Sequence, residues 1–445
     1  MDWHQLLSTK RLGVEDHTSL FREEDRSQFQ RDYDRIIFSA AFRRLQNKTQ
    51  VFPLPGKIFV HNRLTHTLEV ASVGRSLGHR LAEWLFVRNE ITSPSMISEI
   101  GSVVSAACLA HDLGNPPFGH SGESAIANYF MHGHGSQLSS EMSDAEWKDF
   151  TCFDGNANAF RLLTHAFKGK RKGGFALTYT TLASIVKYPF ESTAATKQKL
   201  GFFQSEKNTW LNIAGELQIP MMSSDPLHYV RHPLVYLVEA ADDICYQIMD
   251  VEDAFKLGIL SLEETKALFM AFSVPDDNRV SKSMEETFHR VSDPHEQVSY
   301  LRAGAIGRLT HACFGVFTRH YSEIMEGRYQ SSLLKDIPGE LKFAMERVQE
   351  VSVNRVYNHR TVVEIEVAGY RILGTLMDEF IDALRHPGRP ASGKLLQLMP
   401  EQYHTNRPDM YAKVQTVVDF IAGMTDVYAL DLYRKIKGIS LPEIG

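Results

Sequence analysis

A stretch rich in glycine and proline that also carries histidines and carboxylates, HDLGNPPFGHSGE at residues 111–123, constrains this chain more than any other segment. The preceding residues 93–110 begin with Ser-Pro, a common helix start, and continue with small and apolar side chains. The glycine and the two prolines inside the stretch then end that helix and turn the chain. We therefore predict that His111 and Asp112 lie at a helix end beside a tight bend, where polar side chains can be held rigidly.

His120 and Glu123 follow the bend, at the start of the next predicted helix. Residues three apart on a helix can face each other. A carboxylate that hydrogen-bonds an imidazole fixes its tautomer and raises its basicity, which suits a histidine that transfers a proton. The alternative is a capping pair on a surface helix.

Two further strings place polar side chains in otherwise apolar helices. RLTHTLEV begins at Arg63 and carries His66 one turn later, and VEAADDICY carries Asp242 and Asp243. Buried aspartates are rarely free, because they pair with cations or hydrogen-bond donors. An adjacent His-Asp pair can occur by chance in a chain with 19 histidines, so these additional strings are what make a functional site the better interpretation.

The order His66, His111-Asp112 and Asp242 resembles the H…HD…D signature of the HD superfamily of metal-dependent phosphohydrolases. Longer strings resemble its deoxyguanosine triphosphate triphosphohydrolase (dGTPase) branch, and the resemblance covers most of the chain. These strings are residues 42–53, 63–70, 111–123, 187–189, 241–250 and 421–426.

The resemblance implies one divalent metal ion per subunit. The implied metal ligands are His66, His111, Asp112 and Asp242. A set of imidazoles and carboxylates suits Mn²⁺, our first choice, and also Mg²⁺, Co²⁺, Ni²⁺ or Fe²⁺, better than a thiolate-seeking metal.

Asp242 is preferred over its neighbour Asp243 as the ligand. Tyr246 and Asp250 lie one and two turns beyond Asp242 on the same helical face, whereas Asp243 is rotated about 100° away. In similar enzymes that face carries the metal ligand, a tyrosine under the sugar and an aspartate that bonds the 3′-hydroxyl.

The resemblance also implies the reaction and its residues. His120 and Glu123 are the expected catalytic pair, with water attacking the α-phosphorus of a deoxynucleoside triphosphate such as dGTP to release the deoxynucleoside and inorganic triphosphate. Arg63 is expected at the α-phosphate, and the Lys187-Tyr188 pair at the other phosphates. The full set of expected substrate-binding residues is Gln50, Arg63, Lys187, Tyr188, Tyr246 and Asp250. Ordinary surface roles are the alternative for Arg63, Lys187 and Gln50.

Two other functions remain open at this point. One is a nucleotide-sensing or single-stranded-DNA-binding regulator with weak or no hydrolysis, and the other is an HD 5′-nucleotidase acting on monophosphates. The presence of both His120 and Glu123 favours an enzyme, and Lys187-Tyr188 favours a triphosphate substrate.

Composition indicates the protein class. The net charge of −6 argues against a bulk attraction to nucleic acid or membranes. The four cysteines lack metal-ligand spacing, and no apolar run approaches the roughly 18 residues of a membrane span. We predict a soluble cytoplasmic protein with no membrane partner.

A basic run, KGKRKGG at residues 168–174, stands out against the acidic background. It is either a solvated loop or a loop that contacts the phosphates of an effector dNTP or of single-stranded DNA. Some relatives implied by the resemblance form hexamers, so a homo-oligomer, with a hexamer favoured, is expected. Residues 191–225 follow Lys187-Tyr188 and could close over a triphosphate or form a surface loop.

Helical periodicity dominates the chain and predicts an all-α fold. The resemblance specifies it as an HD-domain helical fold with a C-terminal helical extension. Strand-like patches at residues 51–52 and 58–60 are short, so we expect at most a short β-ribbon before His66. The expected divisions are an N-terminal segment at 1–31, an HD phosphohydrolase core at 32–254 and a C-terminal helical region at 255–445, packed as one continuous domain. Residues 361–366 also have a strand-like pattern, which suggests a further short strand.

Overall fold

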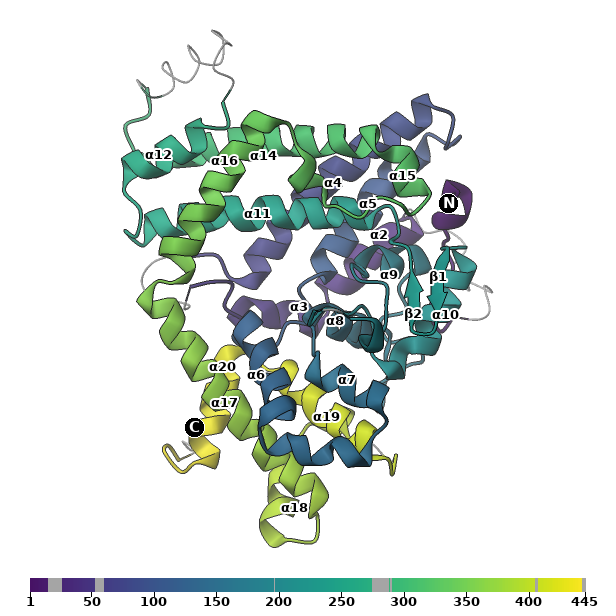
Figure 1. The fold of residues 1–445 in the computed structure, drawn as a ribbon, viewed down its shortest axis with the longest axis vertical. Coiled ribbons are helices and arrows are strands. Elements are labelled where there is room, and N and C mark those ends of the chain that lie inside the picture. The colour runs from purple at the N-terminus through teal and green to yellow at the C-terminus, as the bar shows by residue number, and fades with distance from the viewer. Residues whose placement is uncertain are drawn as a thin grey trace.

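The protein is built almost entirely of helices (Figure 1), which confirms the predicted all-α class. The computed structural model describes residues 1–14, 26–52, 60–195, 197–273, 288, 290–404 and 407–441. In the first half of the chain the α-helices are α1 (Trp3–Leu6), α2 (Gln28–Ile37), α3 (Ala40–Arg44), α4 (Arg63–Val87), α5 (Ser95–Ala110), α6 (Gly119–His132), α7 (Asp144–Thr151), α8 (Gly155–Thr164), α9 (Tyr179–Ile185) and α10 (Lys207–Glu216).

The second half contains the longest helices. They are α11 (Val235–Lys256), α12 (Leu262–Met270), α14 (Pro294–Arg319), α15 (Tyr321–Met325), α16 (Gly339–Val351), α17 (Arg360–Arg385), α18 (Pro390–Leu396), α19 (Met410–Ala422) and α20 (Asp426–Ile436). Short 3-10 turns are η1 (Leu45–Asn47), η2 (His134–Glu141), η3 (Ser192–Ala194), η4 (Gln204–Glu206), η5 (Leu333–Asp336) and η7 (Glu401–Tyr403), and η6 (Ser352–Tyr357) is π-helical.

Helices α4, α5 and α11 form the framework of the upper part of the molecule in Figure 1. Asn62 caps α4 by accepting a hydrogen bond from the Thr65 N–H at 3.0 Å. Helices α4 and α5 lie very close to each other at Gly74. A Cβ atom at this position would lie only 2.4 Å from the Cys108 Sγ atom. Glycine therefore allows the helices that carry His66 and the residues before His111 to approach each other.

Two hydrophobic cores lie above and below the centre of the molecule. The upper core is formed mainly by α2, α4, α5, α9, α11 and α14, and the lower core by α6, α7, α17, α19 and α20 (Figure 1). Helix α8 contributes Phe160 to the upper core and Ala157 to the lower one. Each core draws on residues from both sides of residue 254, and the sequence-based division at that position stays a prediction.

The described β-structure is a small antiparallel ribbon of β1 (Met221–Ser224) and β2 (Leu227–Tyr229). The ribbon expected before His66 falls largely on residues 53–59, which lie outside the described residues. Thr49 and Asn62, on either side of that segment, pair as an isolated antiparallel bridge.

The strand-like interpretation of residues 361–366 was wrong, because they form the first turns of α17. β-branched side chains lower helix propensity only by a few tenths of a kcal/mol. The helix also buries Ile372, Leu373 and Leu376 in the lower core. Burial of this stripe outweighs the weak local preference for a strand.

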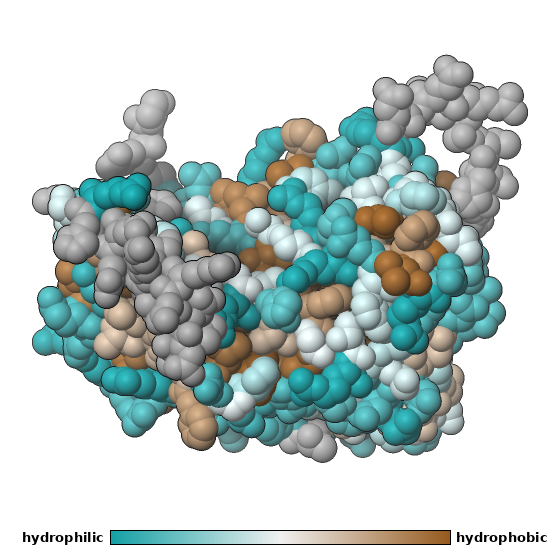
Figure 2. Space-filling model, turned by 90° about the horizontal axis from the view of Figure 1, so that it is seen from above, coloured by the Kyte–Doolittle hydropathy of each residue, from teal (hydrophilic) through white to brown (hydrophobic). Residues whose placement is uncertain are grey.

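The surface is chemically mixed. Seen from above, hydrophilic residues surround several small groups of hydrophobic ones (Figure 2). Among the described helices, none combines the length and the apolarity that a crossing of a lipid bilayer requires.

Candidate active site

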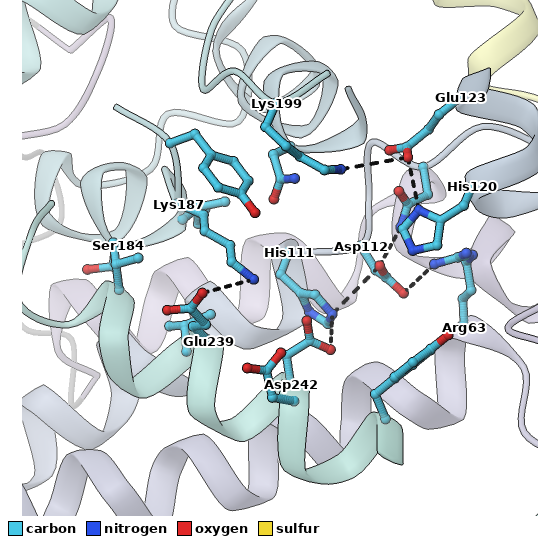
Figure 3. Close-up of a pocket in the computed structure, with 18 of the residues that line it drawn as sticks. Arg63, His111, Asp112, His120, Glu123, Ser184, Lys187, Lys199, Glu239 and Asp242 are labelled. Atoms are coloured by element: carbon cyan, nitrogen blue, oxygen red, sulfur yellow. Dashed lines mark hydrogen bonds and ion pairs between the residues drawn. The ribbon is translucent and has the colours of Figure 1, made fainter. Parts of the chain in front are cut away.

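A cavity of about 270 Å³ opens where α4, α6, α9 and α11 meet (Figure 3). Most of the residues predicted from the sequence line it. They are Gln50, Arg63, His111, Asp112, His120, Glu123, Lys187, Tyr188, Asp242 and Tyr246. His66 and Asp250 lie behind this lining, as described below.

The four predicted metal ligands converge from three separate helical segments. His66 lies on the first turns of α4, His111 and Asp112 follow the end of α5, and Asp242 lies in α11. The Asp242 Oδ1 atom is 3.1 Å from the His66 Nε2 atom and 3.4 Å from the His111 Nε2 atom. One ligand atom each of His66, His111 and Asp112 lies within 4.8 Å of the others. The cluster has the donor set and the compactness that a divalent cation requires.

The orientation of His111 fits a metal ligand. Its Nδ1–H group donates a hydrogen bond to the Cys108 carbonyl at 2.6 Å, which leaves the Nε2 atom, the one that would coordinate a cation, facing the carboxylates. This Nε2 atom is buried and has no hydrogen-bond partner among the described residues. Burial alone would lower the pKa of His111, but the charges of Asp242 and Asp112 outweigh it and raise that pKa to about 9. Carboxylates that hold a proton this firmly would also attract a divalent cation.

Asp242 and the adjacent Asp243 differ in their surroundings. Burial opposes ionisation of Asp242, but His111 and His66 prevail and hold its pKa well below the usual range. Burial raises the pKa of Asp243 to about 7, and the charge of Lys187 only partly offsets this effect. The distances of 3.1 and 3.4 Å show that Asp242 is directed at the two imidazoles, and its role as a metal ligand stays a prediction.

Arg63 forms one wall of the cavity next to this cluster. Its Nη1 atom donates to the Asp112 Oδ2 atom at 2.8 Å, while the Asn115 amide donates to the other carboxylate oxygen. A Cβ atom at Gly119, where φ is +59°, would lie 2.5 Å from the Arg63 Nη2 atom. The Arg63 Nε atom is buried and unpartnered among the described residues. A buried guanidinium with a spare donor is suited to an anion such as phosphate.

His120 and Glu123 form a hydrogen-bonded pair on the first turn of α6. The His120 Nδ1 atom lies 2.9 Å from the Glu123 Oε2 atom, and the Glu123 Oε1 atom accepts a hydrogen bond from the Gly155 N–H at 2.7 Å. The His120 side chain is 73% exposed, whereas that of Glu123 is 10% exposed. The hydrogen bond to Glu123 raises the pKa of His120. The imidazole is thus oriented by a buried carboxylate and open on its other edge.

Asp426 holds the backbone around the pair, a role that sequence reasoning missed. Its two carboxylate oxygens accept hydrogen bonds from the Thr49 N–H at 2.8 Å and the Phe118 N–H at 3.0 Å. Phe118 has a φ of +64° and directly precedes α6. Residues 421–426 were recognised only as a family-like string, because these contacts span more than 300 positions of sequence.

Lys48 also joins backbone segments near the His120–Glu123 pair. The buried ammonium donates to the backbone carbonyls of Asn115 and Ala422, at 2.8 Å for Ala422. Burial lowers the pKa of Lys48 to about 7. The lysine therefore connects the bend after Asp112 to the end of α19.

Two lysines approach the cavity from the side opposite Arg63 (Figure 3). The Lys187 Nζ atom lies 3.2 Å from the Glu239 Oε1 atom. The Lys199 Nζ atom lies 3.6 Å from the Asp154 Oδ1 atom and 4.0 Å from the Glu123 Oε2 atom. Sequence reasoning missed Lys199, and the only signal for it was the position of residues 191–225 after Lys187-Tyr188.

Of three further predicted residues, Gln50 and Tyr246 line the cavity and Asp250 does not. The Gln50 Oε1 atom is buried without a partner among the described residues. The Tyr246 ring lies 6.5 Å from the His66 ring and stacks on Tyr357 at 5.9 Å. Asp250 lies deeper and accepts a hydrogen bond from the Tyr357 hydroxyl at 2.7 Å, and burial raises its pKa to about 8. No sequence signal pointed to Tyr357.

Comparisons with known proteins agree with this arrangement. Residues 63–187 match the HD domain, and residues 336–435 match the phosphohydrolase-associated domain. The chain is 38% identical to a deoxyguanosinetriphosphate triphosphohydrolase-like protein of Synechocystis sp., over 99% of this chain and 100% of the relative. It is 39% identical to such a protein of Pseudomonas aeruginosa, over 99% and 100% of the two chains. Identity to a deoxyguanosinetriphosphate triphosphohydrolase of Yersinia pestis is 29%, over 98% of this chain and 99% of the relative.

Proposed function

The chain belongs to the family of deoxyguanosinetriphosphate triphosphohydrolase-like proteins with an HD domain, and on this premise we propose that it is a metal-dependent deoxynucleoside triphosphate triphosphohydrolase. Its substrates are dGTP or several dNTPs, and its products are the deoxynucleoside and inorganic triphosphate. The observation that carries the proposal is the convergence of His66, His111 and Asp242 next to the His120–Glu123 pair.

The metal ligands in this proposal are His66, His111, Asp112 and Asp242. The orphaned Nε2 atom of His111 and the mixed set of imidazoles and carboxylates support this assignment. A divalent ion held there, Mn²⁺ by our choice, supplies Lewis-acid polarisation of the α-phosphoryl group.

The cationic side chains position the triphosphate. Arg63, which lines the cavity and is held by Asp112, contacts the α-phosphate through its guanidinium group. Lys187 and Lys199 face the β- and γ-phosphates. Their positive charges neutralise the phosphate oxygens in place of solvent cations. Their present carboxylate neighbours keep both ammonium groups in position before the substrate binds.

The sugar lies at the end of the cavity near Tyr246. Gln50 and Asp250 are assigned to the 3′-hydroxyl, with Asp250 exchanging its hydrogen bond with Tyr357 for one with the sugar. The raised pKa of Asp250, about 8, lets its carboxyl group act as donor or acceptor at neutral pH.

His120 supplies the proton that the departing sugar oxygen needs. The water oxygen bonds to the α-phosphorus, the bond between that phosphorus and the 5′-oxygen breaks, and the His120 imidazolium transfers a proton to the 5′-oxygen. The attacking water loses a proton to solvent, and this proton balances the one that His120 gives to the 5′-oxygen. Glu123 favours the protonated imidazole because its hydrogen bond raises the pKa of His120.

The test is incubation with each of the four dNTPs and Mn²⁺ in ¹⁸O-labelled water, with the products resolved by ion-exchange chromatography and mass spectrometry. The proposal requires inorganic triphosphate as the product, with the label in the triphosphate and none in the deoxynucleoside. Release of a deoxynucleoside monophosphate, hydrolysis of monophosphates alone, or binding without turnover would contradict it. EDTA-treated enzyme is the control for metal dependence.

A homo-oligomer, with a hexamer favoured, and a cytoplasmic location stay predictions. Light scattering coupled to size-exclusion chromatography tests the first, and cell fractionation tests the second.

A further inference from the structure

A larger cavity adjoins the active site on the side away from Arg63. Its volume is about 820 Å³, compared with about 270 Å³ for the active-site cavity. We call this second space the outer cavity. The residues that line both cavities are Lys187, Tyr188, Lys199, Glu239 and Asp243. The two cavities therefore meet where the proposed function assigns the γ-phosphate.

We propose that the outer cavity is a subsite for phosphate groups beyond the γ-phosphate, so that the enzyme also hydrolyses deoxynucleoside 5′-tetraphosphates. This inference rests on the proposed triphosphohydrolase function and extends its substrate class. The water oxygen bonds to the α-phosphorus, the bond between that phosphorus and the 5′-oxygen breaks, and the 5′-oxygen takes a proton while the attacking water loses one to solvent. The products are the deoxynucleoside and inorganic tetraphosphate.

The order of the assigned subsites gives the direction in which a longer phosphate chain extends. Arg63, at the α-phosphate, lies opposite Lys187 and Lys199 (Figure 3). Both lysines line the outer cavity, whereas Arg63 does not. Tyr246, where the sugar is assigned, also lines the active-site cavity alone of these two. The outer cavity is therefore at the phosphate end of the substrate, and a chain that continues past the γ-phosphate enters it.

The outer cavity carries an excess of positive charge. Six lysine or arginine residues and four carboxylate residues line it. The cations that it does not share with the active-site cavity are Lys197, Arg231, Lys335 and Lys342. Arg231 pairs with Glu239 at 3.1 Å, but the three lysines form no ion pair in the part of the chain that the structure describes. Because each further phosphate adds negative charge to the substrate, these lysines are suited to bind it.

Two of the four carboxylates are already engaged by other side chains. Glu239 lies 3.2 Å from the Lys187 ammonium and 3.1 Å from the Arg231 guanidinium. Asp336 accepts a hydrogen bond from the Tyr329 hydroxyl at 2.7 Å. The negative charge in the outer cavity is thus partly neutralised within the protein, while three lysines keep their charge for a ligand.

The wall that carries Lys335 and Lys342 is attached to the framework of the molecule. Lys335 lies on η5 and Lys342 on the first turn of α16. Leu333 of η5 is buried in the upper core, and the Tyr236 hydroxyl on α11 donates to the Tyr329 carbonyl at 2.6 Å, shortly before η5. This part of the wall is therefore held against the helix that carries a proposed metal ligand. Both lysine residues are exposed, so their side chains can turn toward a phosphate group.

The test compares the best dNTP substrate with the deoxynucleoside 5′-tetraphosphate of the same base, using Mn²⁺ and ¹⁸O-labelled water. We expect labelled inorganic tetraphosphate as the product, with kcat/KM within about tenfold of that for the dNTP, because the reacting atoms are unchanged. Hydrolysis of the dNTP without hydrolysis of the tetraphosphate would overturn the inference and leave the proposed function in place. Release of a deoxynucleoside phosphate from the tetraphosphate would overturn it as well. Failure to hydrolyse any dNTP would refute both proposals.

The Lys335→Gln/Lys342→Gln double variant tests the cationic wall. It is expected to raise the ratio of the KM for the tetraphosphate to the KM for the dNTP about fivefold, because two charge contacts to the additional phosphate are lost. Arg347→Gln is the matched control, since Arg347 is also exposed on α16 but does not line the outer cavity. Its KM ratio should stay within about twofold of the wild-type value.

An unchanged KM ratio in the double variant would overturn the assignment of the outer cavity. Each ratio compares two substrates on one protein, so a general loss of folded enzyme does not imitate the expected result. If the double variant does not fold, the single variants Lys335→Gln and Lys342→Gln give the same readout, each with an expected increase of about twofold. No increase in either single variant would likewise overturn the assignment.

Discussion

The metal-ligand cluster and the His120–Glu123 pair face the same cavity but belong to different parts of the molecule. The cluster rests on α4, α5 and α11, which form the upper core, whereas the pair lies on α6, which packs in the lower core. The cluster is assembled from distant segments and is mostly buried, with Asp242 partly exposed, whereas the pair is formed by neighbouring residues of one helix and has an exposed imidazole. The proposed ligand set and the proposed proton donor therefore belong to separate parts of the structure, and their relative position depends on the junction between the two cores.

That junction depends on a few polar contacts. Asp426 joins the backbone near Gln50 to the turn before α6, and Lys48 joins the bend after Asp112 to the end of α19. The Gly155 N–H at the start of α8 holds Glu123. These contacts place the proposed acid next to the predicted metal site.

The largest expected effect comes from removing a metal ligand. Asp242→Asn is expected to abolish stoichiometric Mn²⁺ binding and to lower turnover by about 10³-fold or more, because the Lewis acid and the charge that attracts it are lost together. Metal content by mass spectrometry and dNTP turnover measure the two effects. Asp243→Asn is the matched control and is expected to keep the metal. Loss of the metal in the control, with retention in Asp242→Asn, would contradict the assignment of the ligand.

His120→Ala tests whether metal binding and proton transfer depend on separate parts of the site. It is expected to keep the metal and to lose about 10²–10⁴-fold in kcat, the usual contribution of one acid–base group. The same two assays apply. Unchanged turnover would refute the role of His120, and loss of the metal would show that the two regions are not independent.

A substitution at the junction is expected to have an intermediate effect. Asp426→Asn leaves one buried backbone N–H without its carboxylate acceptor, which costs roughly 1–3 kcal/mol of unfolding free energy. Because the turn at Phe118 loses part of its support, kcat should also fall while the metal stays bound. Denaturant titration and turnover test this expectation. A variant with native stability and native kcat would show that Asp426 does not fix the position of the pair.

The smallest effect is a change in pH dependence. The His120 imidazole is active when protonated, so the rate falls as the pH rises through the pKa of His120, which Glu123 raises. Glu123→Gln removes the carboxylate and lowers that pKa, so the alkaline limb of the kcat profile should move to lower pH. The dependence of kcat on pH, recorded from acidic to alkaline pH for both proteins, measures the shift of this limb. Movement of that limb to higher pH would contradict His120 as the proton donor.

Much of the site was predictable because its chemistry is concentrated in short strings. The residues of HDLGNPPFGHSGE are brought together by one bend, and Asp242, Tyr246 and Asp250 share one face of α11. Helical periodicity likewise predicted the all-α fold, and the family resemblance is confirmed by relatives that match over the whole chain.

The contacts that escaped prediction arise only from tertiary packing. Asp426 and Tyr357 reach the site from regions distant in sequence, and Lys199 lies in a segment without a motif. Residues 361–366 were misread as a strand because local β-preference is weak beside the burial of the α17 stripe.

In the proposed enzyme, four side chains from α4, the end of α5 and α11 hold one divalent cation. Crystals grown with Mn²⁺, measured at the manganese absorption edge, test it most directly. We expect one anomalous peak per subunit, coordinated by His66, His111, Asp112 and Asp242. A fully occupied peak elsewhere, or these four side chains without density between them in active enzyme, would contradict it.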